Sequence, residues 1–220
     1  MDFQPYYDQQ EQLRTQTIYI NQLPASIRYV AGADVAYSLD ESQAVGGIVI
    51  LDTTTLEVVE SVSAVVESPF PYVPGLFSFR EIPPLLAAFE KLTIRPDLLV
   101  CDGHGIAHPK RMGMATHLGI ELDLPTIGCA KKRLTGQYDK SKLAEERGAT
   151  LDLTLENEVI GNALRTQFGI KPVFVSIGHK IDLATANEWI LKLSPTYRLP
   201  ETTRQADQLV NKKKKNIISN

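Results

Sequence analysis

The chain has 220 residues, of which 43% are hydrophobic and 22% are charged, values that are ordinary for a globular protein. No apolar run reaches the ~20 residues of a membrane-spanning helix, and the polar start is unlike a signal peptide. Cys101 and Cys129 stand apart in apolar segments, which excludes a disulfide framework and a zinc spacing. We therefore expect one domain over residues 1–220, monomeric, cytoplasmic and without a membrane partner.

The net charge of −3 argues weakly against a nucleic-acid partner, but the charge is unevenly distributed along the chain. Residues 1–103 carry 5 basic and 14 acidic side chains, whereas residues 104–142 carry 7 basic and 3 acidic ones. A second basic island, Lys212 to Lys215, lies within 211–220, which we expect to be a flexible tail. The chain thus has an acidic first half followed by two basic segments. A functional hypothesis has to explain both the acidic and the basic regions.

Hydrophobic periodicity and turn residues predict the elements of the first third of the chain. A polar amphipathic helix is predicted over 5–22. Three apolar, β-prone segments follow over 28–38, 44–53 and 56–67, and the short polar turns between them predict an antiparallel meander. The proline-rich stretch 68–75 has to be a loop.

From residue 78 on, helical and strand patterns alternate. Three antiparallel strands followed by such an alternation predict an α/β fold with a mixed central sheet and helices on both faces, the element order of ribonuclease-H-like folds. A doubly wound Rossmann sheet alternates from its start, and this chain does not. The predicted helices cover 78–92, 110–122, 182–193 and a segment from about Pro200, and the predicted strands cover 97–102, 125–130, 158–166 and 171–178.

Three acidic residues stand at unusual positions in this pattern. Asp34 lies within an apolar strand, where an ionised carboxylate costs several kcal/mol unless something compensates it. Asp102 ends another strand, at the edge where open α/β sheets bind ligands. Glu81 falls in the first turn of a helix. Taken singly, Glu81 is better explained as a helix-dipole residue and Asp102 as a turn residue, whereas Asp34 is harder to explain in such ordinary terms.

The acids together suggest a cation site. If the strands of Asp34 and Asp102 are neighbours, about 4.8 Å apart, their carboxylates can share a hard cation such as Mg²⁺. Such ions commonly bind substrate phosphates, and a pair of them stabilises the attacking and leaving oxygens of an in-line phosphoryl displacement. The acidic first half is then partly a metal site.

Basic residues follow two of the predicted strands, on the edge expected to hold Asp102. A rim of positive charge around a carboxylate cluster suits a phosphate backbone, and a solvated surface is the alternative. His104 and His108 are four residues apart but lack the glutamate of a zinc motif, so His108 is a candidate phosphate contact or proton donor. The candidate phosphate contacts are Lys110, Arg111, Lys132 and Arg133, with Lys131 beside them.

The loop of Pro71, Tyr72, Val73 and Pro74 is stiff, because proline fixes its own φ and restrains the preceding residue. It presents an aromatic side chain on a rigid platform. Tyr72 is therefore either packed onto an ordinary surface turn or a wedge that enters a base step and helps to expose a base.

Several long segments closely resemble the endonuclease V (deoxyinosine 3′ endonuclease) family, in family order. They are AGADVAY (31–37), PFPYVPGLFSFRE (69–81), VCDGHGIAHPKRMGMATHLGI (100–120), PTIGCAKKRL (125–134) and YRLPETTRQAD (197–207). The resemblance implies a ribonuclease-H-like fold and an Mg²⁺-dependent DNA-repair endonuclease, with Mn²⁺ as a substitute. Such an enzyme recognises deoxyinosine and hydrolyses the second phosphodiester bond 3′ to it, leaving a 3′-hydroxyl and a 5′-phosphate.

The resemblance also implies roles for single residues. The positions that match the metal-binding residues of the family are Asp34, Glu81, Asp102 and Asp207. The positions that match its catalytic residues are Asp34, Glu81, Asp102, Lys131 and His108. The strand-separating wedge corresponds to Pro71, Tyr72, Val73 and Pro74. The base pocket corresponds to Gly75, Phe77, Gly103, Gly105, Met114 and Leu134.

Two alternatives stay open at this point. The same site is compatible with a ribonuclease specific for inosine in single-stranded RNA. A non-catalytic protein that binds damaged nucleic acid is the other reading, and it predicts an incomplete acid set, whereas Asp34, Glu81, Asp102 and Asp207 are all present.

Overall fold

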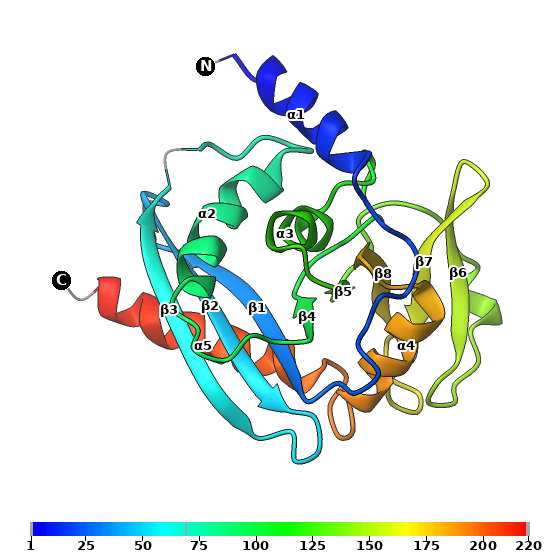
Figure 1. Ribbon diagram of the computed structural model, residues 1–220. Coiled ribbons are helices and arrows are strands. Elements are labelled where there is room, and N and C mark those ends of the chain that lie inside the picture. Colours follow the sequence, from blue (N-terminus) through cyan, green and yellow to red (C-terminus); the bar gives the residue numbers. More distant parts are fainter. Residues whose placement is uncertain (1, 69, 219–220) are drawn as a thin grey trace.

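The computed structural model describes residues 2–68 and 70–218 and contains, within that part of the chain, one eight-stranded sheet (Figure 1). The strand order is β3-β2-β1-β4-β5-β8-β7-β6. Strands β1 (Tyr29–Tyr37), β2 (Gln43–Asp52) and β3 (Val58–Glu67) form the predicted antiparallel meander.

The centre of the sheet is parallel and the far side is antiparallel. Strand β4 (Leu98–Cys101) pairs in parallel with β1, and β5 (Thr126–Ala130) pairs in parallel with β4. Antiparallel pairing then adds the last three strands, β8 (Val173–His179), β7 (Glu158–Leu164) and β6 (Thr150–Leu155). The mixed sheet predicted from the sequence is confirmed.

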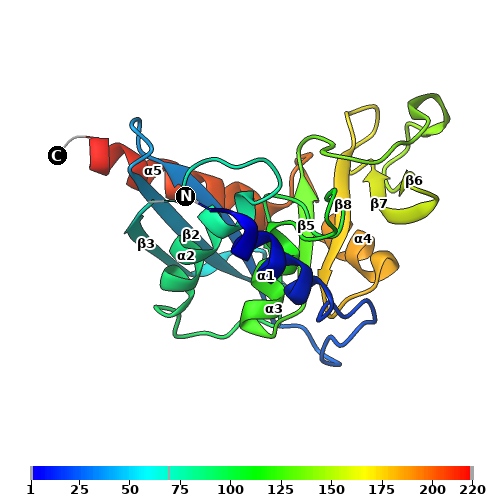
Figure 2. The same ribbon diagram turned by 90° about the horizontal axis from the view of Figure 1, so that it is seen from above.

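Helices cover both faces of the sheet, as predicted (Figures 1 and 2). Helices α2 (Phe77–Phe89) and α3 (Met114–Leu122) pack on one face, and α1 (Gln4–Arg14) lies beside α3. Helices α4 (Leu183–Lys192) and α5 (Glu201–Ile218) pack on the other.

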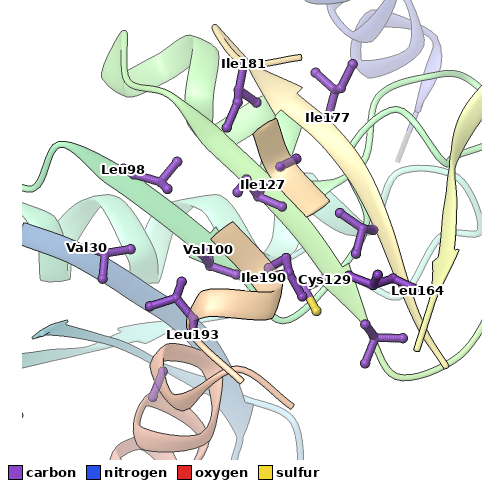
Figure 3. Close-up of a cluster of buried hydrophobic side chains, with 14 of the residues drawn as sticks. Val30, Leu98, Val100, Ile127, Cys129, Leu164, Ile177, Ile181, Ile190 and Leu193 are labelled. Carbon is purple, nitrogen blue, oxygen red and sulfur yellow. The ribbon is translucent and has the colours of Figure 1, made fainter. Parts of the chain in front are cut away.

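The two largest clusters of the core lie one on each side of the sheet. Because successive strand residues point to opposite faces, Val100 packs under α4 while Leu99 packs under α2 and α3. Figure 3 shows the first of these clusters, in which Ile190 of α4 lies over the strand residues Val100 and Cys129. Within the described part of the chain, no helix is long and apolar enough to cross a membrane.

Four sequence-based expectations need correction. The first helix ends at Arg14 instead of residue 22, because the segment that follows it contacts the chain just beyond β8, where the amide of Lys180 donates to the carbonyl oxygen of Ile18 at 2.8 Å. Helix α3 begins at Met114 instead of residue 110, since Gly113 is extended. Strand β6 has no counterpart among the predicted strands.

The basic segment expected to be a flexible tail is helical over its described residues, because α5 continues to Ile218. Lysine is a good helix former, and neither proline nor glycine interrupts residues 201–218. The last two residues of the expected tail, 219–220, lie outside the described part.

Candidate active site

Parallel pairing of β1 with β4 brings the first two acids together. Ala33 and Cys101 are register partners, and the amide of Asp102 donates to the carbonyl oxygen of Ala33 at 3.1 Å. Asp34 and Asp102 therefore follow directly on two adjacent paired positions. The condition for a shared cation, that their strands are neighbours, is met.

Helix α5 supplies a third acid, Asp207, from the opposite side. It approaches β1 closely because Gly32 has no side chain: a Cβ there would lie 2.1 Å from the carbonyl oxygen of Thr202. One carboxylate oxygen from each of Asp34, Asp102 and Asp207 lies within 4.8 Å of the others. Carboxylate oxygens at this spacing are the ligands that a hard divalent cation takes.

The electrostatics of the cluster favour a cation. Burial, followed by the charge of Asp102, raises the pKa of Asp34 to about 7, although a hydrogen bond from the Val35 amide (2.9 Å) opposes the rise. Glu81 is buried on α2, and burial together with the charges of Asp34 and Asp102 raises its pKa well above the usual value. A bound cation relieves this crowding of negative charge, so the residues fit a metal ion. Glu81 is outside the group of three, and its role as a ligand stays a prediction.

Lys131 already contacts the cluster from the end of β5. Its Nζ lies 2.5 Å from Asp102 Oδ2 and 3.5 Å from Asp207 Oδ1. Burial lowers the pKa of Lys131, but the hydrogen bond and charge of Asp102 outweigh that effect and raise it overall. The ammonium group is therefore charged and held at the acids.

A cavity of about 690 Å³ opens beside the cluster and reaches Asp102, Lys131 and Glu81. Its volume is in the range of sites that enclose a small molecule or a single base. Its walls include five of the six residues expected to form a base pocket, namely Gly75, Phe77, Gly103, Met114 and Leu134.

The sixth, Gly105, does not line the cavity, which corrects that expectation. Its amide donates to Ser176 Oγ at 2.9 Å in a buried position. A Cβ on Gly105 would lie 1.9 Å from the carbonyl oxygen of Ile177. Gly105 is therefore needed where the glycine-rich turn packs onto β8, behind the cavity wall.

The proline-rich loop forms one rim of the cavity. Tyr72 is 65% exposed, and its ring packs edge-on against Phe77 with centroids 5.7 Å apart. The loop is supported from behind by α1, where buried Gln10 donates from Nε2 to the carbonyl oxygen of Gly75 at 2.7 Å. The sequence did not point to Gln10; a glutamine within a polar helix carries no distinctive signal.

Arg80 is a second residue that the sequence did not single out. It is buried beside Glu81, donates to Glu41 Oε2 at 2.9 Å and stacks 4.2 Å from the ring centre of Tyr37. Its charge is the one influence that lowers the pKa of Glu81. An arginine directly before Glu81 in an otherwise apolar helix was the available signal.

His108 lies in the cavity wall as a neutral imidazole. Burial, with a smaller contribution from His104, lowers its pKa to about 4. The amide of Lys110 donates to His108 Nδ1 at 3.2 Å, which leaves the proton on Nε2. His108 is thus a hydrogen-bond donor at neutral pH, not a cation.

The four candidate phosphate contacts are not gathered at one place. Lys132 lines the cavity, and the guanidinium of Arg133 donates to the carbonyl oxygen of Gly136 at 2.7 Å. Arg111 is paired with Glu158 at 2.9 Å. Lys110 lines a separate hollow beside α1. Of the four, the structure brings Lys132 to the cavity.

Together, the mixed sheet, the carboxylates spaced for a cation and the adjoining cavity are the features of a metal-dependent nuclease of the ribonuclease-H-like class. A family model of endonuclease V matches residues 11–208. The chain belongs to the endonuclease V family and is an endonuclease of DNA repair.

Relatives of known sequence and solved structures match this chain over nearly its whole length. Endonuclease V of Nostoc punctiforme is 47% identical over 204 residues, which cover 93% of this chain and 91% of that protein. The crystal structure of endonuclease V from Streptomyces avermitilis is similar with a TM-score of 0.93 at 45% identity, covering 98% and 94% of the two chains. Endonuclease V of Ciona intestinalis, in complex with a 24mer DNA containing an inosine followed by a ribo-adenosine, has a TM-score of 0.83 at 29% identity, covering 97% and 98%.

Proposed function

We propose that this endonuclease recognises deoxyinosine in DNA and hydrolyses the second phosphodiester bond 3′ to it, leaving a 3′-hydroxyl and a 5′-phosphate. The observation that carries the proposal is the junction of the cavity with the carboxylates, because Asp102 and Lys131 belong to both. A flipped base and a phosphate of the same strand can therefore be held together. The inosine-containing DNA bound by the Ciona relative supports the choice of substrate.

The cavity suits a base that is read by its edge. Hypoxanthine presents O6 as an acceptor and N1–H as a donor, and it lacks the exocyclic amine of guanine. Gly75 and Gly103 expose backbone at the cavity wall, while Phe77 and Met114 supply apolar surface for stacking. A wall that offers no space or partner for the amine discriminates against guanine. Tyr72 at the rim is the proposed wedge that opens the duplex.

We propose Mg²⁺ as the cation, held by Asp34, Asp102 and Asp207 with Glu81 beside them, and Mn²⁺ as a substitute. When bound, such an ion supplies positive charge to the scissile phosphate and lowers the pKa of water. Lys131 stabilises the charge that develops on the phosphate oxygens.

Two further side chains act at the same centre in this proposal. The Glu81 carboxylate orients the attacking water. His108 donates a hydrogen bond from Nε2 to a phosphate oxygen, as its neutral state allows. All of these groups come from one chain, which supports action as a monomer. Cys101 and Cys129 are free and buried, which supports work in a reducing compartment, the cytoplasm.

The deciding experiment is nicking of a duplex with one deoxyinosine in the presence of Mg²⁺, beside the same duplex with adenine or guanine. We expect a single cut at the second bond 3′ to the lesion, and no cut after Asp102→Asn. Full activity of Asp102→Asn in Mg²⁺ would overturn the metal assignment. Faster cleavage of a matched inosine-containing RNA would favour the ribonuclease alternative, and tight binding without any cleavage would favour a non-catalytic binder.

A further inference from the structure

A second hollow meets the base cavity at the carboxylate cluster. This groove, about 500 Å³, begins at Asp34, Asp102 and Asp207 and continues between the β1–β2 hairpin and α5. Asp102 and Lys131 line both hollows. The groove thus offers a path for a strand that has its base in the cavity and a phosphate at the acids.

Helix α5 carries a lysine into this groove. Asp207, Asn211 and Lys214 all line it, and their spacing of four and seven residues places them on one face of the helix. Lys214 is half-buried, whereas Lys212, Lys213 and Lys215 are exposed. In Figure 2 the red end of α5 lies beside the blue hairpin that joins β1 and β2. The helix thus extends the site by two turns beyond Asp207, past residue 208, where the match to the family model ends.

The charges along the groove are arranged for a polyanion. Its acidic end is the cluster that a cation neutralises, with Lys131 already in contact with it. Glu41, on the hairpin wall, is paired with Arg80. Lys214 therefore supplies positive charge at the end of the groove away from the acids.

We propose that Lys214 binds a backbone phosphate of the cleaved strand on the 3′ side of the scissile bond. This inference rests on the proposed function, which places the lesion in the cavity, 5′ of the cut, and so leaves the groove for the strand that departs with the 5′-phosphate. Asp207 and Lys214 are separated by about 10.5 Å along the helix axis, and a strand rises about 3.4 Å per nucleotide. The bound phosphate lies within about three nucleotides of the cut.

The first test compares Lys214→Ala with Lys213→Ala. Both substitutions remove one positive charge from neighbouring positions of α5, and alanine keeps the high helix propensity of lysine. The two variants should therefore be equal in long-range attraction to DNA and in stability of the helix. Deoxyinosine oligonucleotides carry either one or eight nucleotides 3′ of the scissile bond, on a constant 5′ part.

We expect the longer flank to raise kcat/KM by about three- to tenfold for the wild type and for Lys213→Ala. For Lys214→Ala, we expect the same kcat/KM on the short and the long substrate. An equal loss on both substrates after Lys214→Ala would overturn the proposal. Indifference of the wild type to flank length would also overturn it.

A binding measurement separates this proposal from the proposed function. Fluorescence anisotropy of the same labelled single strands, with EDTA and at several salt concentrations, requires no cleavage. We expect Lys214→Ala to reduce the slope of log K against log salt by about 0.7 on the long flank only, and Lys213→Ala to leave it unchanged. A reduction of the same size with Lys213→Ala would show non-specific attraction and refute the site. Failure of the wild type to cut deoxyinosine would refute the proposed function alone, because the salt slopes still test Lys214.

Discussion

Replacing Gly32 by alanine is expected to disable the enzyme without touching any acid. The new Cβ would lie 2.1 Å from the backbone carbonyl oxygen of Thr202 in α5, whereas ordinary contact begins at 3.4 Å. The helix and β1 then have to separate by about 1.3 Å, since backbone atoms cannot rotate away as a side chain can. Asp207 is carried by that helix and moves with it.

The magnitude follows from two effects. Overpacking of this kind costs about 1–3 kcal/mol of stability, and each kcal/mol lowers Tm by about 2–4 °C in a chain of this size. A displacement of about 1 Å at a catalytic group costs on the order of 100-fold in rate. We therefore expect Gly32→Ala to fold, to melt several degrees lower, and to lose about 100-fold in kcat at saturating Mg²⁺.

The assay is single-turnover nicking of a deoxyinosine duplex over a range of Mg²⁺ concentrations, with thermal denaturation in parallel. Gly47→Ala is the matched control, because its Cβ would meet the side chains of Val210 and Leu209 in the same helix instead of its backbone. We expect that variant to lose stability as well, because the buried side chain of Val210 has to shift, but to retain most of its activity, because the backbone of α5 is not displaced. Wild-type Tm and rate in Gly32→Ala would refute the argument that close approach of α5 positions Asp207.

Three further expectations concern single side chains. Tyr72→Ala should lower kcat/KM on duplex substrate more than on single strands, because only a duplex has to be opened; equal losses would contradict the wedge. Lys131→Met should lower the single-turnover rate by about 100-fold or more while leaving the fold intact by circular dichroism; a near-normal rate would exclude a role at the phosphate. Burial lowers the pKa of His117 to about 4, so the unfolded chain takes up a proton below pH 6.5 that the folded chain does not. His117 should contribute a loss of up to about 3 kcal/mol of stability as pH drops from 6.5 to 4, in addition to that of His108, and His117→Gln should reduce the slope of stability against pH in urea denaturation; an unchanged slope would contradict it.

Local sequence patterns were sufficient for most strands and for two acids of the site. The apolar runs around Asp34 and Asp102 predicted buried strands, and both strands are central. A carboxylate within such a run is costly unless compensated, so its position alone indicated a cation site. Strand β6 escaped prediction although leucines alternate along it, because the residues between them, Asp152 and Thr154, are polar and mask the apolar pattern.

The amino-acid sequence was enough to determine the family and the candidate acids of the site. Motifs and hydrophobic periodicity are properties of residues that are close in the chain, so they can be read without the tertiary structure. Tertiary structure alone decided which of the candidate residues meet. In the folded chain, Gly105 lies behind the cavity wall and Arg111 is paired with Glu158. Lys214 lies on the same face of α5 as Asp207 and lines the groove. These outcomes depend on contacts between segments far apart in the chain, where the approach of α5 to β1 and of the glycine turn to β8 is set by packing.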